Sequence, residues 1–250
     1  MNKLKMFLEN LDLSEEDKSF RFPKRISEEY EGLEGTEPES AALDFKSIQS
    51  FVAGVSKQRQ EDVLNSMLLA QRGATKLSPN DDQIMEWYKK YFEILDKIGW
   101  VFESKDFMEF KSQHNIFEID NALLEILGTV ITGNQMAIMM KTIQSLKSLG
   151  ENDNRFKAFE KNTHSLQRGS FQLGLASEAN NTLSMSGSAF ILNTKKNITK
   201  ILFFNSDRDA TEFRFCQIKA TLNDGIYGGV REMIKEKLGD VSGFIADLEI

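Results

Sequence analysis

Residues 169–192 read GSFQLGLASEANNTLSMSGSAFIL, and the alternation within this stretch decides the fold class. In its second half, apolar side chains and glycine or alanine alternate with serine and threonine. Successive side chains of a strand point to opposite faces of a sheet, so this pattern predicts a half-buried strand. Asn180 and Asn181 favour a turn between the two halves. The stretch therefore predicts a β-hairpin.

The sequence after this hairpin predicts more strands and then helices. Residues 198–204 and 212–222 have strand character, which would extend the hairpin to an antiparallel meander. Residues 226–238 place apolar side chains at helical spacing before Gly239, a residue that commonly ends a helix. The last apolar set, over 241–248, also has helical spacing.

Helical periodicity dominates the first half of the chain. Apolar side chains recur at helical spacing over 45–55 and 63–73, over 84–98, and again over 123–130 and 136–149. A short strand pair is predicted over 100–111. The predicted fold class is α+β: an N-terminal helical layer packs on an antiparallel sheet of about four strands or more, closed by C-terminal helices.

The formal net charge of −7 is concentrated near the N-terminus. Residues 14–40 hold nine acids and four bases, which leaves the rest of the chain nearly balanced. We expect residues 1–40 to form a short helix and an acidic flexible arm. Residues 41–250 then form a single α+β domain, helical over 41–150, mainly β over 169–222 and helical over 225–250. The acidic balance argues against a nucleic-acid partner.

No segment predicts export or membrane insertion. The apolar start of the chain stops at Glu9, too early for a signal peptide, and no run of about 18 apolar residues follows. We therefore expect a soluble protein made in the cytoplasm, with export by a dedicated secretion system left open.

Motifs of common enzyme and cofactor classes are missing from the sequence. It contains no P-loop, dinucleotide fingerprint, nucleophile elbow or zinc-protease helix. One cysteine and two histidines predict neither a disulfide framework nor a metal site, and no cofactor is expected. His114 and His164 are candidate general bases because the pKa of histidine lies near neutral pH.

Cys216 lies in a predicted strand and has three interpretations. It is a catalytic nucleophile if a cation such as Arg214, on the same strand face, lowers the pKa of its thiol. It is a small core residue if it is buried. It is a lipid attachment site if the thiol carries a thioester-linked acyl chain.

Two apolar helices and the serine-rich strand indicate a surface for an apolar ligand. Methionine suits adaptable binding surfaces, and the strand has one apolar face and one hydroxyl face. Both features are also typical of ordinary core packing. The candidate residues for an apolar ligand or lipid are Leu127, Val130, Met136, Met139, Met140, Met185 and Cys216.

Two groups of residues resemble a diffuse family of soluble microbial proteins, to which we attach no activity. The resemblance covers about residues 60–250, outside the acidic arm. It is carried by aromatic, aliphatic and glycine residues of types that commonly specify a fold. The residues are Leu68-Leu69-Ala70-Gln71, Trp87-Tyr88, Tyr91, Leu95, Ile98-Gly99-Trp100, Leu222-Asn223, Tyr227, Val230-Arg231, Lys237-Leu238-Gly239-Asp240 and Phe244-Ile245-Ala246.

The favoured function is a non-enzymatic binding or effector-type protein, a candidate virulence factor, that engages an apolar ligand, a lipid membrane or a protein partner. One alternative is a hydrolase or transferase that uses Cys216 or a histidine. Another is a structural protein that forms homo-oligomers.

Overall fold

The computed structural model describes residues 2–15, 19, 22 and 37–250. Its main feature is a sheet of eight strands in which all neighbours are antiparallel except β2 and β6. The strands follow the order β10 (Ile245–Leu248), β1 (Ser40–Asp44), β2 (Ser47–Phe51), β6 (Arg168–Ala179), β7 (Thr182–Thr194), β9 (Thr211–Leu222) and β3 (Trp100–Phe102), and β4 (Met108–Phe110) also pairs with β9. The predicted α+β class is confirmed.

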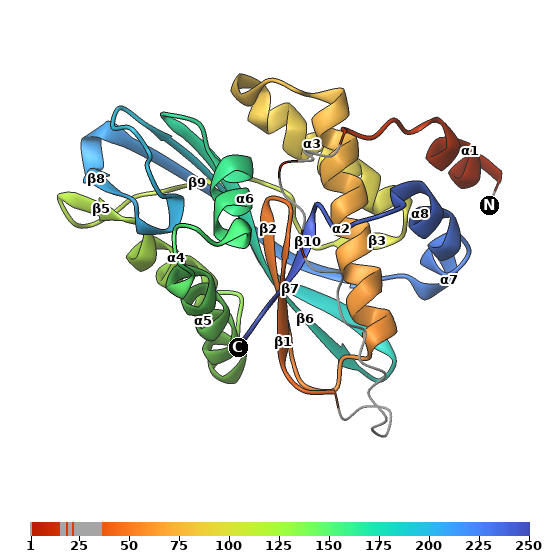
Figure 1. Ribbon diagram of the computed structural model, residues 1–250. Coiled ribbons are helices and arrows are strands. Elements are labelled where there is room, and N and C mark those ends of the chain that lie inside the picture. Colours follow the sequence, from red (N-terminus) through yellow and green to blue (C-terminus); the bar gives the residue numbers. More distant parts are fainter. Residues whose placement is uncertain (1, 16–18, 20–21, 23–36) are drawn as a thin grey trace.

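Helices cover both faces of the sheet (Figure 1). One layer holds α1 (Asn2–Asn10), α2 (Lys57–Leu77), α3 (Ile84–Lys97), α7 (Asp224–Tyr227) and α8 (Arg231–Leu238). The other holds α4 (Ile119–Leu127), α5 (Gly133–Ser148) and α6 (Asn154–Thr163). Each layer buries its own apolar core against the sheet, so the sheet has two internal faces. Smaller elements are the strand pair β5 (Ile116–Glu118) and β8 (Asn205–Asp207) and the 3-10 helices Asp81–Gln83, Ile201–Phe203 and Arg208–Ala210.

The hairpin predicted from residues 169–192 is confirmed. β6 and β7 pair along their whole length, from Arg168 opposite Asn193 to Ala179 opposite Thr182. Asn180 and Asn181 form the two-residue turn with φ of 51° and 59°. Two central residues with positive φ define the turn whose twist matches that of the flanking strands, and asparagine tolerates that conformation.

Two predicted helices are wrong because their residues form strands. The helical prediction over 45–55 falls on the β1–β2 hairpin, with Phe45 at φ 54° in its turn. All five residues of β2 are buried, including the polar Ser47, Gln49 and Ser50, so polar and apolar residues do not mark an outer and an inner face. The helix predicted over 241–248 is replaced by β10, which forms an edge of the sheet beside β1.

Three smaller predictions also differ from the structure, and one helix was not predicted. The strand predicted over 198–204 is a 3-10 turn with flanking loops, and α6 occupies a polar segment for which no helix was predicted. The predicted helix over 226–238 is divided into α7 and α8. The strands at 100–111 both exist, but each pairs with β9 instead of with the other. The acidic arm predicted within 1–40 lies for the most part outside the described residues.

Candidate functional site

Cys216 is fully buried in β9, on the sheet face that α2 and α3 cover. Burial, and secondarily the charge of Asp106, raises the pKa of its thiol to about 12. Arg214, the expected activating cation, pairs with Glu212 at 2.6 Å. A thiol with this pKa remains protonated at neutral pH, and the thiolate is the nucleophilic form. The environment of Cys216 therefore does not favour the cysteine-dependent hydrolase.

His164 directly follows α6, and both of its ring nitrogens have acceptors. Nε2 lies 2.8 Å from Oε2 of Glu160, and Nδ1 lies 3.0 Å from the carbonyl oxygen of Ser165. Burial lowers the pKa of His164, but the hydrogen bonds to Glu160 and Ser165 outweigh it and raise the pKa above its usual value. A ring that donates from both nitrogens has no lone pair for a substrate proton.

His114 is exposed in the loop before β5. It lines a pocket of about 200 Å³ together with Glu118 and Glu125 of the following segment. The structure thus brings His114 near carboxylates, as the enzyme alternative requires. Glu118 is engaged by Asn121, whose amide donates to Oε2 at 2.7 Å.

The predicted apolar-ligand residues fall on both sides of the sheet. Leu127 and Met139 are buried in the core beneath α4 and α5. Val130, Met136 and Met140 are partly buried against the same core. In contrast, Met185 and Cys216 lie in the opposite core. The five residues of α4, α5 and their connection belong to or pack against one core, and the two sheet residues belong to the other.

The sheet face beneath α4 and α5 carries an aromatic ladder formed by Phe171, Phe190 and Phe213. The ring centroids of Phe171 and Phe190 are 5.0 Å apart, and those of Phe190 and Phe213 are 5.6 Å apart with nearly parallel planes. These residues come from β6, β7 and β9, which have 12 or 13 residues each. The ladder therefore forms an apolar band across the three longest strands.

Neutral hydrogen bonds connect the α4–α5 layer to this face. The Ser50 hydroxyl on β2 donates to Oγ1 of Thr142 on α5 at 2.9 Å. The Gln217 amide on β9 donates to Oγ1 of Thr129, just after α4, at 2.6 Å. Neutral hydrogen bonds contribute about 1 kcal/mol each. The layer is therefore held mainly by apolar packing.

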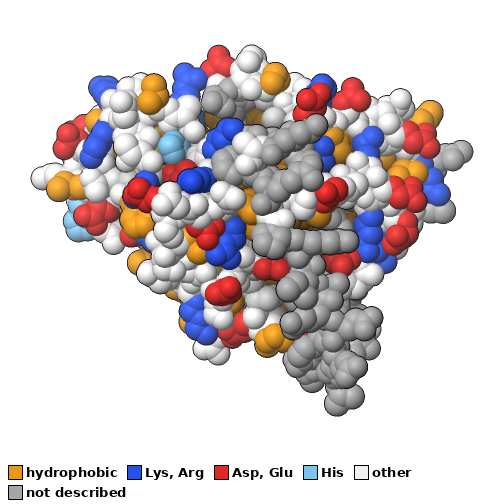
Figure 2. Space-filling model, in the orientation of Figure 1, with side chains coloured by type: hydrophobic (Ala, Val, Ile, Leu, Met, Phe, Trp, Pro, Cys, Tyr) orange, Lys and Arg blue, Asp and Glu red, His pale blue; other side chains and the backbone are white. Residues whose placement is uncertain are grey.

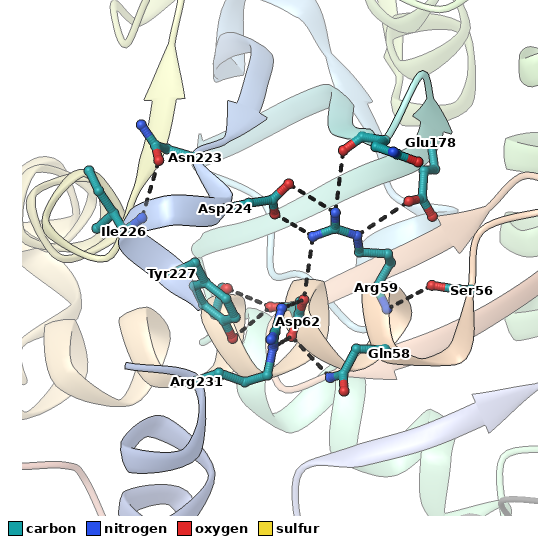
Figure 3. A network of polar contacts seen from close by, with 12 residues as sticks. Ser56, Gln58, Arg59, Asp62, Glu178, Asn223, Asp224, Ile226, Tyr227 and Arg231 are labelled. Atoms are coloured by element: carbon teal, nitrogen blue, oxygen red, sulfur yellow. Dashed lines mark hydrogen bonds and ion pairs between the residues drawn. The ribbon is translucent and has the colours of Figure 1, made fainter. Parts of the chain in front are cut away.

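A charged cluster within the opposite layer, the Asp62 clamp, consists of Arg59, Asp62, Glu178, Asp224 and Arg231 (Figure 3). It reaches the sheet through the pair of Arg59 with Glu178. Asp62 on α2 is fully buried and receives Nε and Nη2 of Arg231 at 2.7 and 2.8 Å. Arg59, one turn earlier, pairs with Asp224 and, at 3.3 Å, with Glu178 of β6. The clamp thus joins α2 to α7, α8 and the β6–β7 hairpin.

Sequence reasoning missed the Asp62 clamp and the ladder. Arg59 and Asp62 are three residues apart on α2, a spacing that indicates only a helical ion pair. Arg231 is 169 residues from Asp62, so its role depends on tertiary structure. The ladder residues are all recognisable as strand residues, but their stacking depends on the register of three strands.

The described residues add three observations. On the face shown in Figure 2, hydrophobic side chains occur in small groups among charged ones and form no continuous apolar patch. No helix among the described residues combines the length and apolarity needed to cross a membrane. Across residues 2–15, 19, 22 and 37–250, no group of three His, Cys, Asp or Glu side chains could hold a metal ion.

The fold is thus a mixed sheet between two helical layers. Comparisons with solved structures return matches at low similarity. A delta-endotoxin matches with a TM-score of 0.38 and 12% identity over 80% of this chain and 88% of its own. Activated Cyt2Ba from Bacillus thuringiensis subsp. israelensis matches with a TM-score of 0.36 and 10% identity over 72% and 97%. The Evf virulence factor matches with a TM-score of 0.31 and 10% identity over 94% and 87%.

No family model and no curated protein matches the sequence. The function of this chain is therefore inferred from its own geometry.

Proposed function

We propose that this protein is a non-enzymatic, effector-type binding protein that engages a lipid surface when the α4–α5 layer moves away from the aromatic ladder. The observation that supports this proposal is that different kinds of contact hold the two helical layers. Packing, neutral hydrogen bonds and an exposed ion pair of Lys141 with Glu39 hold α4 and α5. The Asp62 clamp instead ties α2 to α8 through a buried ion pair and to β6 through Arg59.

Lipid can replace one layer at much lower cost than the other. Acyl chains supply the apolar contacts that Phe171, Phe190 and Phe213 now make with the helices, and the lost neutral hydrogen bonds can be remade with water. Removal of α2 from its neighbours would instead leave Asp62 without Arg231 in an apolar interior. Breaking a buried ion pair costs roughly 3–5 kcal/mol. The α4–α5 side is therefore the favoured membrane-facing side.

A disulfide between α5 and the sheet tests this proposal. The hydroxyl oxygens of Ser50 and Thr142 are 2.9 Å apart, so cysteines at these positions bring their sulfur atoms within bonding reach. The Ser50→Cys/Thr142→Cys variant is made in a Cys216→Ala background. Flotation with phosphatidylcholine vesicles and release of an entrapped dye are measured before and after reduction.

A matched disulfide controls for the effect of the cross-link itself. Ser177 and Ser184 are opposite each other on β6 and β7, so Ser177→Cys/Ser184→Cys joins two strands that stay together in the proposed motion. We expect the oxidised α5 lock to abolish vesicle binding and dye release, reduction to restore both, and the control to behave as the Cys216→Ala parent. Equal activity of the oxidised lock and the parent, or no vesicle binding by the parent, would refute the proposal.

A further inference from the structure

A hollow of about 540 Å³ lies between α1 and the last turn of α2. Both helices belong to the layer that covers the α2 face of the sheet, so the hollow is separate from the lipid-facing side proposed above. Small-molecule sites in proteins measure about 300–1,000 Å³ and are lined mainly by apolar side chains with a few polar groups. The hollow has the volume of such a site.

Four apolar side chains line the hollow, and two of them are exposed. Leu11 is buried, and Phe7 is partly buried against the same core. Met6 on α1 is 56% exposed and Leu77 at the end of α2 is 54% exposed. Large apolar side chains that gather on a surface mark a binding site more often than isolated ones do. The hollow therefore offers contacts to an apolar chain.

Positive charge accompanies this apolar lining. Lys3 on α1 and Lys76 on α2 both line the hollow, are exposed and form no ion pair with any described residue. Asp12 is also part of the lining, so the two lysines outnumber the acid among the described residues. Beside the hollow, Nζ of Lys97 lies 4.0 Å from the ring centroid of Phe7. An excess of cations at an apolar surface favours a ligand that has an apolar body and an anionic end.

We propose that this hollow binds a free fatty acid, with its chain against Met6, Phe7 and Leu77 and its carboxylate at Lys3 and Lys76. A methylene group is about as large as a water molecule, which occupies about 30 Å³, so the volume matches one chain of roughly twelve to eighteen carbon atoms. This inference does not rest on the proposed lipid engagement, because a fatty acid can bind here while vesicles do not bind.

Calorimetric titration with dodecanoate at about pH 8, below its micelle concentration, tests the proposal. Dodecyltrimethylammonium is the matched ligand, because it has the same chain and a cationic head group. The charge variant is Lys3→Gln/Lys76→Gln. Its control, Lys195→Gln/Lys219→Gln, removes two exposed lysines that lie outside the hollow. Unfolding of each variant by urea, without ligand, checks that the substitutions leave the fold intact.

A second pair of variants tests the contacts with the chain. Met6→Ser/Leu77→Ser removes the two exposed apolar side chains of the hollow. Its control is Met85→Ser/Leu166→Ser, which replaces apolar side chains that are 46% and 70% exposed outside the hollow. Because all four side chains are exposed, these substitutions leave the packing of the core unchanged.

We expect saturable binding of dodecanoate to the wild type and to both controls. Affinity should fall by about fivefold in the charge variant and by about tenfold in the apolar variant. Dodecyltrimethylammonium should bind the wild type more weakly than dodecanoate does, and its affinity should not fall in the charge variant. Absence of saturable dodecanoate binding, equal affinities of either variant and its control, or equal affinities of the wild type for the two ligands would overturn the proposal.

Discussion

The two helical layers cover the same sheet but are attached to it by different chemistry. In the α2 layer, Gln71 accepts the N–H of Lys46 at 2.9 Å and the Tyr88 hydroxyl donates to the carbonyl oxygens of Phe171 and Phe190 at 3.3 Å. The Asp62 clamp ties α2 to α8 within this layer and reaches the sheet through Arg59 and Glu178 of β6. The α4–α5 layer rests on an apolar band with neutral polar contacts and an exposed ion pair between Lys141 and Glu39. We therefore expect the α2 layer to stay on the sheet in contact with lipid and the α4–α5 layer to move away from it.

The largest expected effect concerns the clamp. Asp62→Asn removes the charge that compensates Arg231, and we expect a loss of roughly 3–5 kcal/mol in the free energy of unfolding. Urea denaturation measures it. Asp120→Asn is the matched control, because Asp120 pairs with Lys147 on the exposed side of the α4–α5 layer and its loss should cost no more than about 1 kcal/mol. Similar losses of unfolding free energy in the two variants would contradict the proposed difference between the contacts of the two layers.

A smaller effect is expected at the contact between α5 and β2. Thr142→Val leaves the buried Ser50 hydroxyl without its main acceptor, and we expect a loss of about 1–2 kcal/mol in the free energy of unfolding. Adding Ser50→Ala removes both partners and should recover most of that loss. The double variant should also bind vesicles no less well than the wild type. If the double variant does not regain unfolding free energy, the loss in Thr142→Val does not come from the hydrogen bond between Ser50 and Thr142.

These two contacts illustrate what the sequence can predict. The β6–β7 hairpin follows from strict alternation and two asparagines, and α3 follows from an apolar stripe at helical spacing. Strands β2 and β10 were predicted as helices because strands of five and four residues are too short to distinguish a period of two from helical spacing. Nothing local marks such segments as strands, since their neighbours in the sheet come from distant parts of the chain.

The sequence predicted the residue types of the candidate site but not their positions in the fold. The apolar character of α4 and α5 is visible in the sequence, and Leu127 and Met139 do lie in one core. The assignment of Met185 and Cys216 to the opposite core depends on which face each helical layer covers. Similarly, His164 could be identified as titratable, but its fixation by Glu160 depends on the path of the chain after α6.

The smallest stability effect is expected at His164. The pKa of His164 is lowered by burial and raised by Glu160 and Ser165, with a net increase in the folded state. A raised folded-state pKa contributes stability that is complete below about pH 6.5 and is lost as the pH rises through the folded-state pKa. Lys46, Lys161 and Arg168 line the same pocket as His164.

His164→Gln should therefore reduce the free energy of unfolding by about 1 kcal/mol near pH 5.5 and by less at pH 8.5. Urea denaturation of both proteins across this range gives the difference. A difference that grows with pH would contradict the charged pairing with Glu160.

The central claim is that lipid uncovers one face of the sheet and leaves the other covered, and two cysteines on these faces test it most directly. Native Cys216 reports on the α2 face, and Ser188→Cys in a Cys216→Ala background reports on the ladder face, since Ser188 is fully buried two residues from Phe190. Each protein is treated with an apolar thiol reagent that partitions into bilayers, with and without phosphatidylcholine vesicles. We predict that vesicles increase labelling at position 188 and leave Cys216 protected. Unchanged protection at position 188, or labelling of both positions, would contradict the account.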